Sequence, residues 1–223
     1  MTMRRWIAGA VLGVALSRPG IAQQDTMLLL AGDREASAEL AKIVSATRDA
    51  GLPIDPILAK VRYGVSVAHA PPTRIVAAAR MVASRLETAR DALAPRPTPN
   101  DIAVGADALA YGATREALRA VRAASRDQLL ATPLGVLAQL LASGVPAKRA
   151  SEIVTDLLKR GASGPQLVAL GNDVNADVAS GAQALAALDT RLRGLTAVLA
   201  PGGGAAGQPG LTSASGPTGP KKP

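Results

Sequence analysis

The chain has 223 residues, with 25 Lys and Arg against 17 Asp and Glu, and no cysteine. Without cysteine it can form neither disulfides nor thiolate metal sites, so a hydrophobic core alone must hold the fold. It has two tyrosines, one tryptophan and no phenylalanine. This scarcity argues against aromatic platforms for stacking nucleic-acid bases or sugars.

The first element in chain order is a leader at residues 1–22. Arg4 and Arg5 precede an apolar run at residues 7–16, and small residues end the segment, which is the pattern of a secretory signal peptide. The run is about half as long as the roughly 20 residues of a membrane-spanning helix, so we expect cleavage rather than anchoring. The mature chain would begin near Gln23 as a soluble exported protein, periplasmic or secreted. It would not be a lipoprotein, because cysteine is absent.

Export also changes the charge balance. The signal peptide takes Arg4, Arg5 and Arg18 with it, and Lys221 and Lys222 lie in the C-terminal tail. Twenty basic residues then face 17 acidic ones in the folded part, a net charge of +3 rather than the +8 of the whole chain. So small an excess argues against nucleic acid as a partner, because nucleic-acid-binding domains carry a clustered basic face.

Apolar residues recur at helical spacing along the folded part, and no alternating run of β-branched residues indicates a sheet. The pattern predicts an all-α fold, an irregular bundle of about nine short and medium helices joined by Gly-capped turns. We expect one all-helical domain over residues 23–200 and a disordered Gly/Pro-rich tail over residues 201–223. The predicted helices are residues 34–50, 56–63, 72–94, 99–111, 115–125, 133–143, 147–160, 164–179 and 184–199.

Two of these helices carry the clearest apolar stripes. The stripe of the helix at residues 72–94 runs through Ile75, Ala79, Val82, Leu86, Ala89 and Leu93. The stripe of the helix at residues 184–199 has the same rhythm at Leu185, Leu188, Leu192, Leu195 and Leu199. We expect both stripes to face the core, and the second helix to close the bundle.

Glycine marks the predicted helix ends. A left-handed residue after the last helical turn favours glycine, and an apolar residue followed by a polar residue or proline comes next. The stretch 51–66 resembles the stretch 144–163, which predicts a duplicated hairpin, but the unequal spacing of the glycines argues against a regular solenoid. We expect a helix to stop at each of Gly51, Gly64, Gly112, Gly144, Gly161 and Gly181.

Helix starts are predicted from capping residues. Asp55, Thr98 and Thr132 each precede a proline, which tolerates the first helical position. Ser163 and Gln166 have the spacing of a capping box. We therefore expect helices to begin directly after Asp55, Thr98, Thr132 and Ser163.

Few side chains suggest catalysis or metal binding. His69 is the only histidine and lies in a predicted connection, where a hydrogen-bonded or solvated role is favoured over a base or a lone ligand. Asp173 and Asp177 would share a helix face as paired acids or oxygen ligands, although a helix start capped by Asn172 or Asp173 is favoured. With no nucleophile beside a base, we expect no enzyme, no cofactor, no metal and no small-molecule ligand.

One predicted helix face carries arginines at steps of four and three, namely Arg115, Arg119, Arg122 and, beyond them, Arg126. This face would meet an anionic surface such as lipid headgroups or an acidic partner, and a solvated helix face is the common alternative. Tyr63 and Tyr111 each precede a predicted capping glycine. We expect both rings to lie at the rim of the core in the same role, rather than in contact with a ligand.

The phrase GLPIDPILAKV at residues 51–61, followed by PPTRIV at residues 71–76, resembles uncharacterised exported bacterial proteins rich in Ala and Arg. The resemblance covers residues 51–181 and implies export and helices, and that group has no assigned activity. We therefore expect an exported non-enzymatic helical protein that binds another protein or a cell-envelope component. The alternative is a peripheral binder of anionic lipid or envelope polymer, acting through the arginine-rich helix face and the basic tail.

Overall fold

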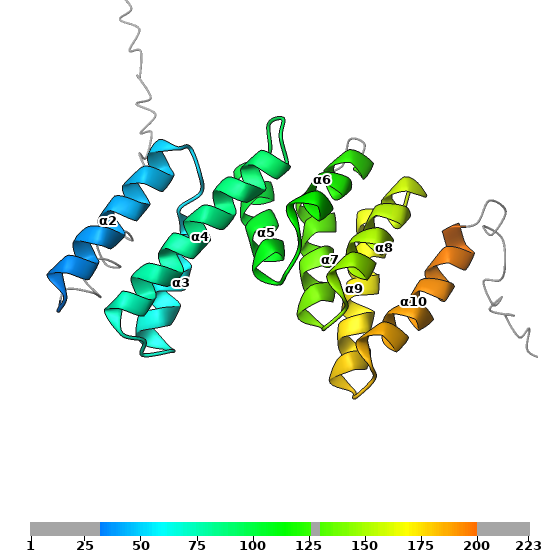
Figure 1. Cartoon of the computed structure of the whole chain (residues 1–223). Coiled ribbons are helices and arrows are strands. Elements are labelled where there is room, and N and C mark those ends of the chain that lie inside the picture. The colour runs from blue at the N-terminus through cyan, green and yellow to red at the C-terminus, as the bar shows by residue number, and fades with distance from the viewer. Residues whose placement is uncertain (1–31, 126–129, 200–223) are drawn as a thin grey trace, which may run out of the picture. The chain divides into compact units, whose positions relative to one another are not determined.

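The computed structural model describes residues 32–125 and 130–199 (Figure 1). Within these ranges every regular element is a helix, which confirms the predicted all-α bundle. Each helix overlaps one that the sequence predicted, with ends displaced by a few residues at most. The helices are α2 (Arg34–Asp49), α3 (Asp55–Ser66), α4 (Pro72–Ala92), α5 (Pro99–Ala110), α6 (Arg115–Ala124), α7 (Ala131–Ala142), α8 (Ala147–Lys159), α9 (Gly164–Ala179) and α10 (Ala184–Leu199).

The chain divides into two compact units, an N-terminal unit of residues 1–87 and a C-terminal unit of residues 88–223. The boundary falls inside α4. The expectation of one domain over residues 23–200 stays a prediction. The predicted signal peptide, the predicted tail and Arg126 lie outside the described residues.

In the N-terminal unit, α2, α3 and the first part of α4 each bury one apolar face. An ion pair joins two of these helices, since a terminal nitrogen of Arg80 on α4 donates to Glu39 on α2 at 2.7 Å. The members of the predicted α4 stripe that belong to this unit face inward, with Val82 half-buried and Ile75, Ala79 and Leu86 buried. The core side chains of the unit without solvent exposure are Leu40, Val44, Ile57, Val61, Ala79 and Leu86.

Gly64 is a position where the predicted helix end is wrong. α3 continues through Gly64 to Ser66, so the chain does not turn there. A Cβ atom at Gly64 would lie 3.0 Å from Cγ1 of Ile75 on α4. The glycine serves the close approach of two helices instead of a left-handed turn, and the local sequence has the same form in both cases.

The other five predicted glycine ends are confirmed. In the turn at Gly144, the glycine N–H donates to the carbonyl of Leu141 and the N–H of Val145 donates to the carbonyl of Leu140, both at 3.0 Å. This is the Schellman pattern, and its apolar residue, Val145, is 3% exposed. The glycines with positive φ, between +70° and +99°, are Gly51, Gly112, Gly144, Gly161 and Gly181.

The C-terminal unit stacks its helices in two rows (Figure 1). α7 lies between α5 and α9 and also contacts α8, while α6 packs on α8 and α10 packs on α9. Leu134, Leu137 and Leu140 of α7 have no solvent exposure. α7 is therefore the centre of the core of this unit.

Hairpin turns at Gly112, Gly144 and Gly181 join the two rows of the C-terminal unit. The same α-turn-α hairpin thus recurs along this part of the chain. The duplication suggested by the stretches 51–66 and 144–163 fails, because Gly64 ends no helix.

Two predicted helix starts are confirmed by their capping contacts. Thr98 Oγ1 accepts from the N–H of Asp101 at 3.1 Å, and the Asp101 carboxylate accepts from the N–H of Thr98 at 3.0 Å. At the start of α9, the Gln166 side-chain oxygen accepts from the N–H of Ser163 at 2.8 Å. These reciprocal contacts satisfy N–H groups that have no acceptor inside the helix.

Three other expectations about the helices are wrong. Asp55 and Thr132 lie inside α3 and α7 rather than before them, and neither helix has a side-chain cap. The prolines that follow still fit, because N–H groups of the first turn have no helical acceptor to lose. Leu185 is 45% exposed instead of core-facing, whereas Leu188 of the same stripe is fully buried. α10 is the last described helix of the stack, so part of its apolar stripe has no neighbouring helix.

Candidate functional site

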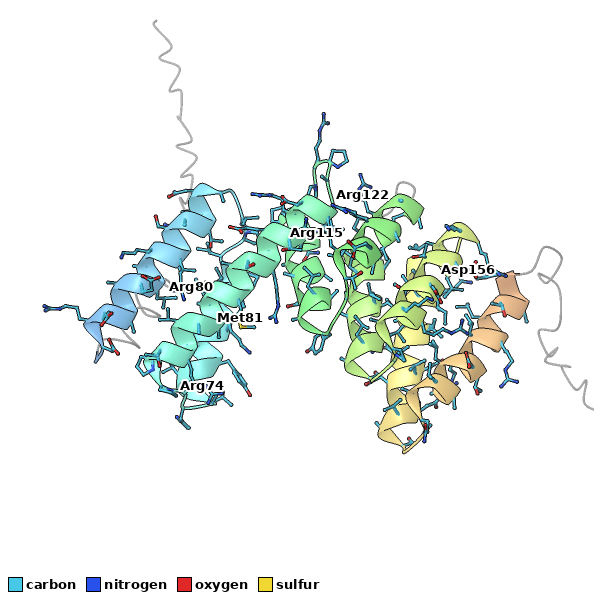
Figure 2. The ribbon with its side chains drawn as sticks, in the orientation of Figure 1. Arg74, Arg80, Met81, Arg115, Arg122 and Asp156 are labelled. Carbon is cyan, nitrogen blue, oxygen red and sulfur yellow. The ribbon has the colours of Figure 1, made fainter. Side chains whose placement is uncertain are left out.

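The α6 arginine face, which we define as Arg115, Arg119 and Arg122, follows from the pronounced amphipathicity of α6. The helix buries a stripe of small and aliphatic side chains, with Leu118 and Val121 fully buried. Arg115 lies in its first turn and Arg122 near its end (Figure 2). Arg115 and Arg119 are exposed and Arg122 is half-buried. The structure therefore places all three described members of the predicted face on the side of α6 away from its apolar stripe.

None of the three arginines forms a salt bridge with any residue that the structure describes. The carboxylate nearest in sequence, Glu116, is held at the start of the helix. Its pKa is lowered first by a hydrogen bond from its own backbone N–H and then by the hydroxyl of Thr114, with smaller contributions from Arg119 and Arg115. The α6 arginine face thus keeps guanidinium groups available to an external anion.

Three arginines on the later helices of the same unit are paired with carboxylates, whereas Arg193 on α10 donates only to a backbone carbonyl of its own helix. The three paired arginines neutralise carboxylates on their own helix or on another helix of the unit, and so act within the fold. The pairs are Arg149 with Asp189 at 3.0 Å, Arg160 with Asp156 at 2.8 Å, and Arg191 with Asp177 at 2.7 Å and with Asp173 at 3.6 Å.

The Asp173 and Asp177 pair lies in the second half of α9, which begins at Gly164, so the predicted helix start at Asn172 or Asp173 is wrong. Both carboxylates do share one helix face, and Arg191 of α10 lies against them. Its guanidinium donates to both oxygens of Asp177, each at 2.7 Å, and lowers the pKa of that carboxyl. The two acids serve as anchors for α10 rather than as open metal ligands.

A second set of polar contacts links α7 to α9, and sequence analysis missed it. Gln139 Nε2 donates to Asn172 at 3.1 Å, and the Ser143 hydroxyl donates to Asn175 at 3.3 Å. A Cβ atom at Gly171 would lie 2.5 Å from the Gln139 side-chain oxygen, so the glycine leaves room for that side chain. The spacing of Gln139 to Ser143 and of Asn172 to Asn175 puts each pair on one helix face, but the sequence does not show that the two faces meet.

In the N-terminal unit, His69 lies in the connection between α3 and α4, as the sequence predicted, and is exposed. Its φ of 44° is a left-handed conformation that is uncommon outside glycine. His69 lines a half-open cavity of about 520 Å³ together with Lys60, Tyr63 and Arg74. The Nζ atom of Lys60 lies 5.5 Å from the centre of the Tyr63 ring, a cation–π distance. We call this the Lys60 cavity. The sequence pointed to His69 and Tyr63 separately but not to their basic neighbours.

The two tyrosines occupy different positions in their helices. Tyr63 lies inside α3, whereas Tyr111 is the C-cap of α5. Their expected common place before a capping glycine is therefore wrong for Tyr63. Both side chains are more than half exposed, at 54% and 57%.

Taken together, the described helices form an all-α protein with one unpaired cationic helix face and one basic cavity. Among residues 32–125 and 130–199, no three side chains of metal-ligating type cluster, and no helix is both long and apolar enough to cross a bilayer. No family model matches the chain, and neither a curated protein nor a solved structure matches it.

Proposed function

We propose that this protein is an exported, non-enzymatic helical module that binds an acidic surface of another protein of the cell envelope through the α6 arginine face. The observation that carries the proposal is the contrast in pairing. Arg115, Arg119 and Arg122 lie side by side without a salt bridge to any described residue, while Arg149 and Arg191 of the same unit are paired.

The chemistry of the guanidinium group supports an acidic protein partner. Its planar fork of donors matches the two oxygens of a carboxylate, and such bidentate contacts are among the stronger hydrogen bonds. Arginine is enriched at protein–protein interfaces, and complementary charge speeds the encounter of two partners. A row of three arginines on a rigid helix supplies these contacts without a large change in shape.

A site-specific crosslink tests the partner surface. A photo-reactive side chain replaces Arg119 on α6 in one variant and Lys159, an exposed residue on α8, in the control. With envelope extract, the position-119 variant should give a discrete crosslinked species that the position-159 variant does not. The same species from both positions, or no species from position 119, would contradict the proposal.

The second candidate is peripheral binding of anionic lipid or envelope polymer by the same face, which the close spacing of three like charges favours. Each cation near an anionic membrane surface contributes about 1 kcal/mol, and the attraction is screened by salt. Cosedimentation with phosphatidylglycerol vesicles should then occur at low salt and weaken as salt is raised. Vesicle binding that ignores salt rejects this candidate.

Export is the part of the proposal that rests on residues 1–22, which lie outside the described residues. Signal peptidase cleavage would leave a chain that begins near Gln23 and has lost the single tryptophan, Trp6. Mass spectrometry of the protein from the periplasm or medium should find this amino terminus. Its fluorescence should be that of tyrosine alone, and a tryptophan spectrum would show that the leader is retained.

A further inference from the structure

The Lys60 cavity has the chemistry of an anion site. Lys60 and Tyr63 come from the second half of α3, and His69 comes from the connection that follows it. Arg74 comes from the first turn of α4, where Figure 2 labels it. Two basic side chains, Lys60 and Arg74, thus line one hollow of about 520 Å³, which is large enough for a small metabolite.

No carboxylate belongs to the described lining of this cavity. Asp33 lines an adjoining hollow that shares His69, but its carboxylate accepts from the N–H of Ala36 at 3.0 Å and caps α2. Neither Lys60 nor Arg74 forms a salt bridge with another described residue. Their charges are therefore not neutralised within the described part of the unit.

We propose that the Lys60 cavity binds a small soluble molecule that carries a phosphate monoester, with Lys60 and Arg74 holding the phosphate. The charges of Lys60 and Arg74 are best balanced by a ligand with two negative charges. A phosphate monoester carries nearly two negative charges at pH 7, whereas a single carboxylate carries one. Arg74 offers a fork of donors and Lys60 a point charge, the two common ways of binding phosphate. The start of α4 beside Arg74 adds the positive end of a helix dipole.

The remaining lining groups suit the organic part of such a ligand. The Tyr63 ring is half-exposed and presents a flat apolar face with a hydroxyl at its edge. His69 supplies a ring nitrogen that donates or accepts a hydrogen bond. This site is independent of the α6 arginine face, because the two belong to different units.

Calorimetric titration of the purified full chain with phenyl phosphate tests the proposal, with benzoate as a ligand of similar ring and single charge. Phenyl phosphate should bind saturably and benzoate at least about tenfold more weakly, because the second charge is then unmatched. The double variant Lys60→Gln/Arg74→Gln should weaken phenyl phosphate binding by about tenfold or more. Arg62→Gln, which removes an exposed charge from the same helix outside the cavity, should leave it unchanged.

Thermal melting shows whether the double variant is folded, and Lys60→Arg, which keeps the charge, should retain most of the binding. The proposal is overturned if wild type gives no saturable heat, if benzoate binds equally well, or if Arg62→Gln weakens binding as much as the double variant. Vesicles that contain phosphatidic acid, whose headgroup is itself a phosphate monoester, form a further arm. If they, and not phenyl phosphate, require Lys60 and Arg74, then the phosphate is read on a lipid and the soluble ligand is rejected.

Discussion

Arg191 of α10 and the arginines of α6, in two helices of the C-terminal unit, differ in whether an acidic side chain neutralises them. On α10, Arg191 donates to both oxygens of Asp177 and also lies near Asp173, so its charge is used to hold α10 against α9. On α6, Arg115 and Arg119 project into solvent and form no salt bridge with a described residue. The same side chain is thus a structural brace in one region and an available charge in the other.

The difference comes from where the acids lie. α9 offers two carboxylates on one face at a step of four, and the hairpin at Gly181 brings α10 alongside them. α6 packs on α8, and the acid of its first turn, Glu116, is engaged by the helix start. Loss of a braced arginine should therefore change stability, and loss of an available one should change binding.

Both regions rest on the core around α7, and removing part of that core gives the largest expected effect. Leu137 is fully buried in α7, so Leu137→Ala leaves a cavity and should lower the free energy of unfolding by about 2–5 kcal/mol. Leu185→Ala, at a 45% exposed position on α10, is the matched control and should cost less than about 1 kcal/mol. Chemical denaturation measures both values. Equal losses in the two variants would contradict the central place of α7.

Reversing the charges of the α6 arginine face should give the next largest effect. The variant Arg115→Glu/Arg119→Glu/Arg122→Glu should bind its acidic partner, or anionic vesicles at low salt, at least about a hundredfold more weakly, since loss of each cation costs about 1 kcal/mol and each new carboxylate adds repulsion. Its melting temperature should stay close to that of wild type, because no described salt bridge is lost.

A control with the same net charge shows whether position matters. Arg62→Glu/Lys148→Glu/Lys159→Glu disperses the three reversals over exposed positions on α3 and α8. This control should keep most of the binding. If the two triple variants lose affinity equally, net charge rather than the α6 arginine face is responsible.

Removing the brace on α10 should have a smaller effect, and on stability alone. Arg191→Ala leaves Asp173 and Asp177 next to each other without their cation, so α10 should exchange its amide hydrogens faster and the melting temperature should fall by a few degrees at most. Arg193→Ala is the control, because Arg193 contacts only a backbone carbonyl of its own helix. Equal rates of amide hydrogen exchange in α10 of the two variants would show that Arg191 does not hold α10 against α9.

The smallest expected effect is a pH dependence. Arg191 lowers the pKa of Asp177 in the folded state, so the pair stabilises the fold above about pH 4, the ordinary aspartate value, and this contribution fades as the pH falls through the lowered pKa. The melting temperature of wild type should therefore drop more steeply in acid than that of Asp177→Asn. If the melting temperatures of the two proteins fall in parallel as the pH is lowered, the contact between Arg191 and Asp177 does not stabilise the fold in solution.

The helices and their ends were largely predictable from the sequence, because they depend on neighbours a few residues apart. Thr98 with Asp101, and the glycine at 144, illustrate signals whose physical cause is local. Gly64 shows the limit of such signals. Gly64 leaves room for the side chain of Ile75 on the next helix, whereas other glycines in the chain form left-handed turns. The residues around the glycine follow the same pattern in both cases, so the sequence does not distinguish them.

The candidate surfaces were predictable only where one helix carries them. The stripe of Arg115, Arg119 and Arg122 follows from helical spacing, but its lack of acidic partners depends on which helices pack together. The Lys60 cavity is lined by residues of both α3 and α4. It could not be predicted from the sequence, because helical spacing does not show that Lys60 and Arg74 line the same hollow.

Arginine-selective chemical labelling, with and without envelope extract, tests the central claim most directly. In the free protein, Arg115 and Arg119 should react faster than Arg191, whose guanidinium is held by Asp177. Addition of extract should protect the α6 arginine face and leave Arg62, an exposed arginine of α3, as reactive as before. Labelling of Arg115 and Arg119 at the same rate in both conditions would contradict the claim that this face binds a partner.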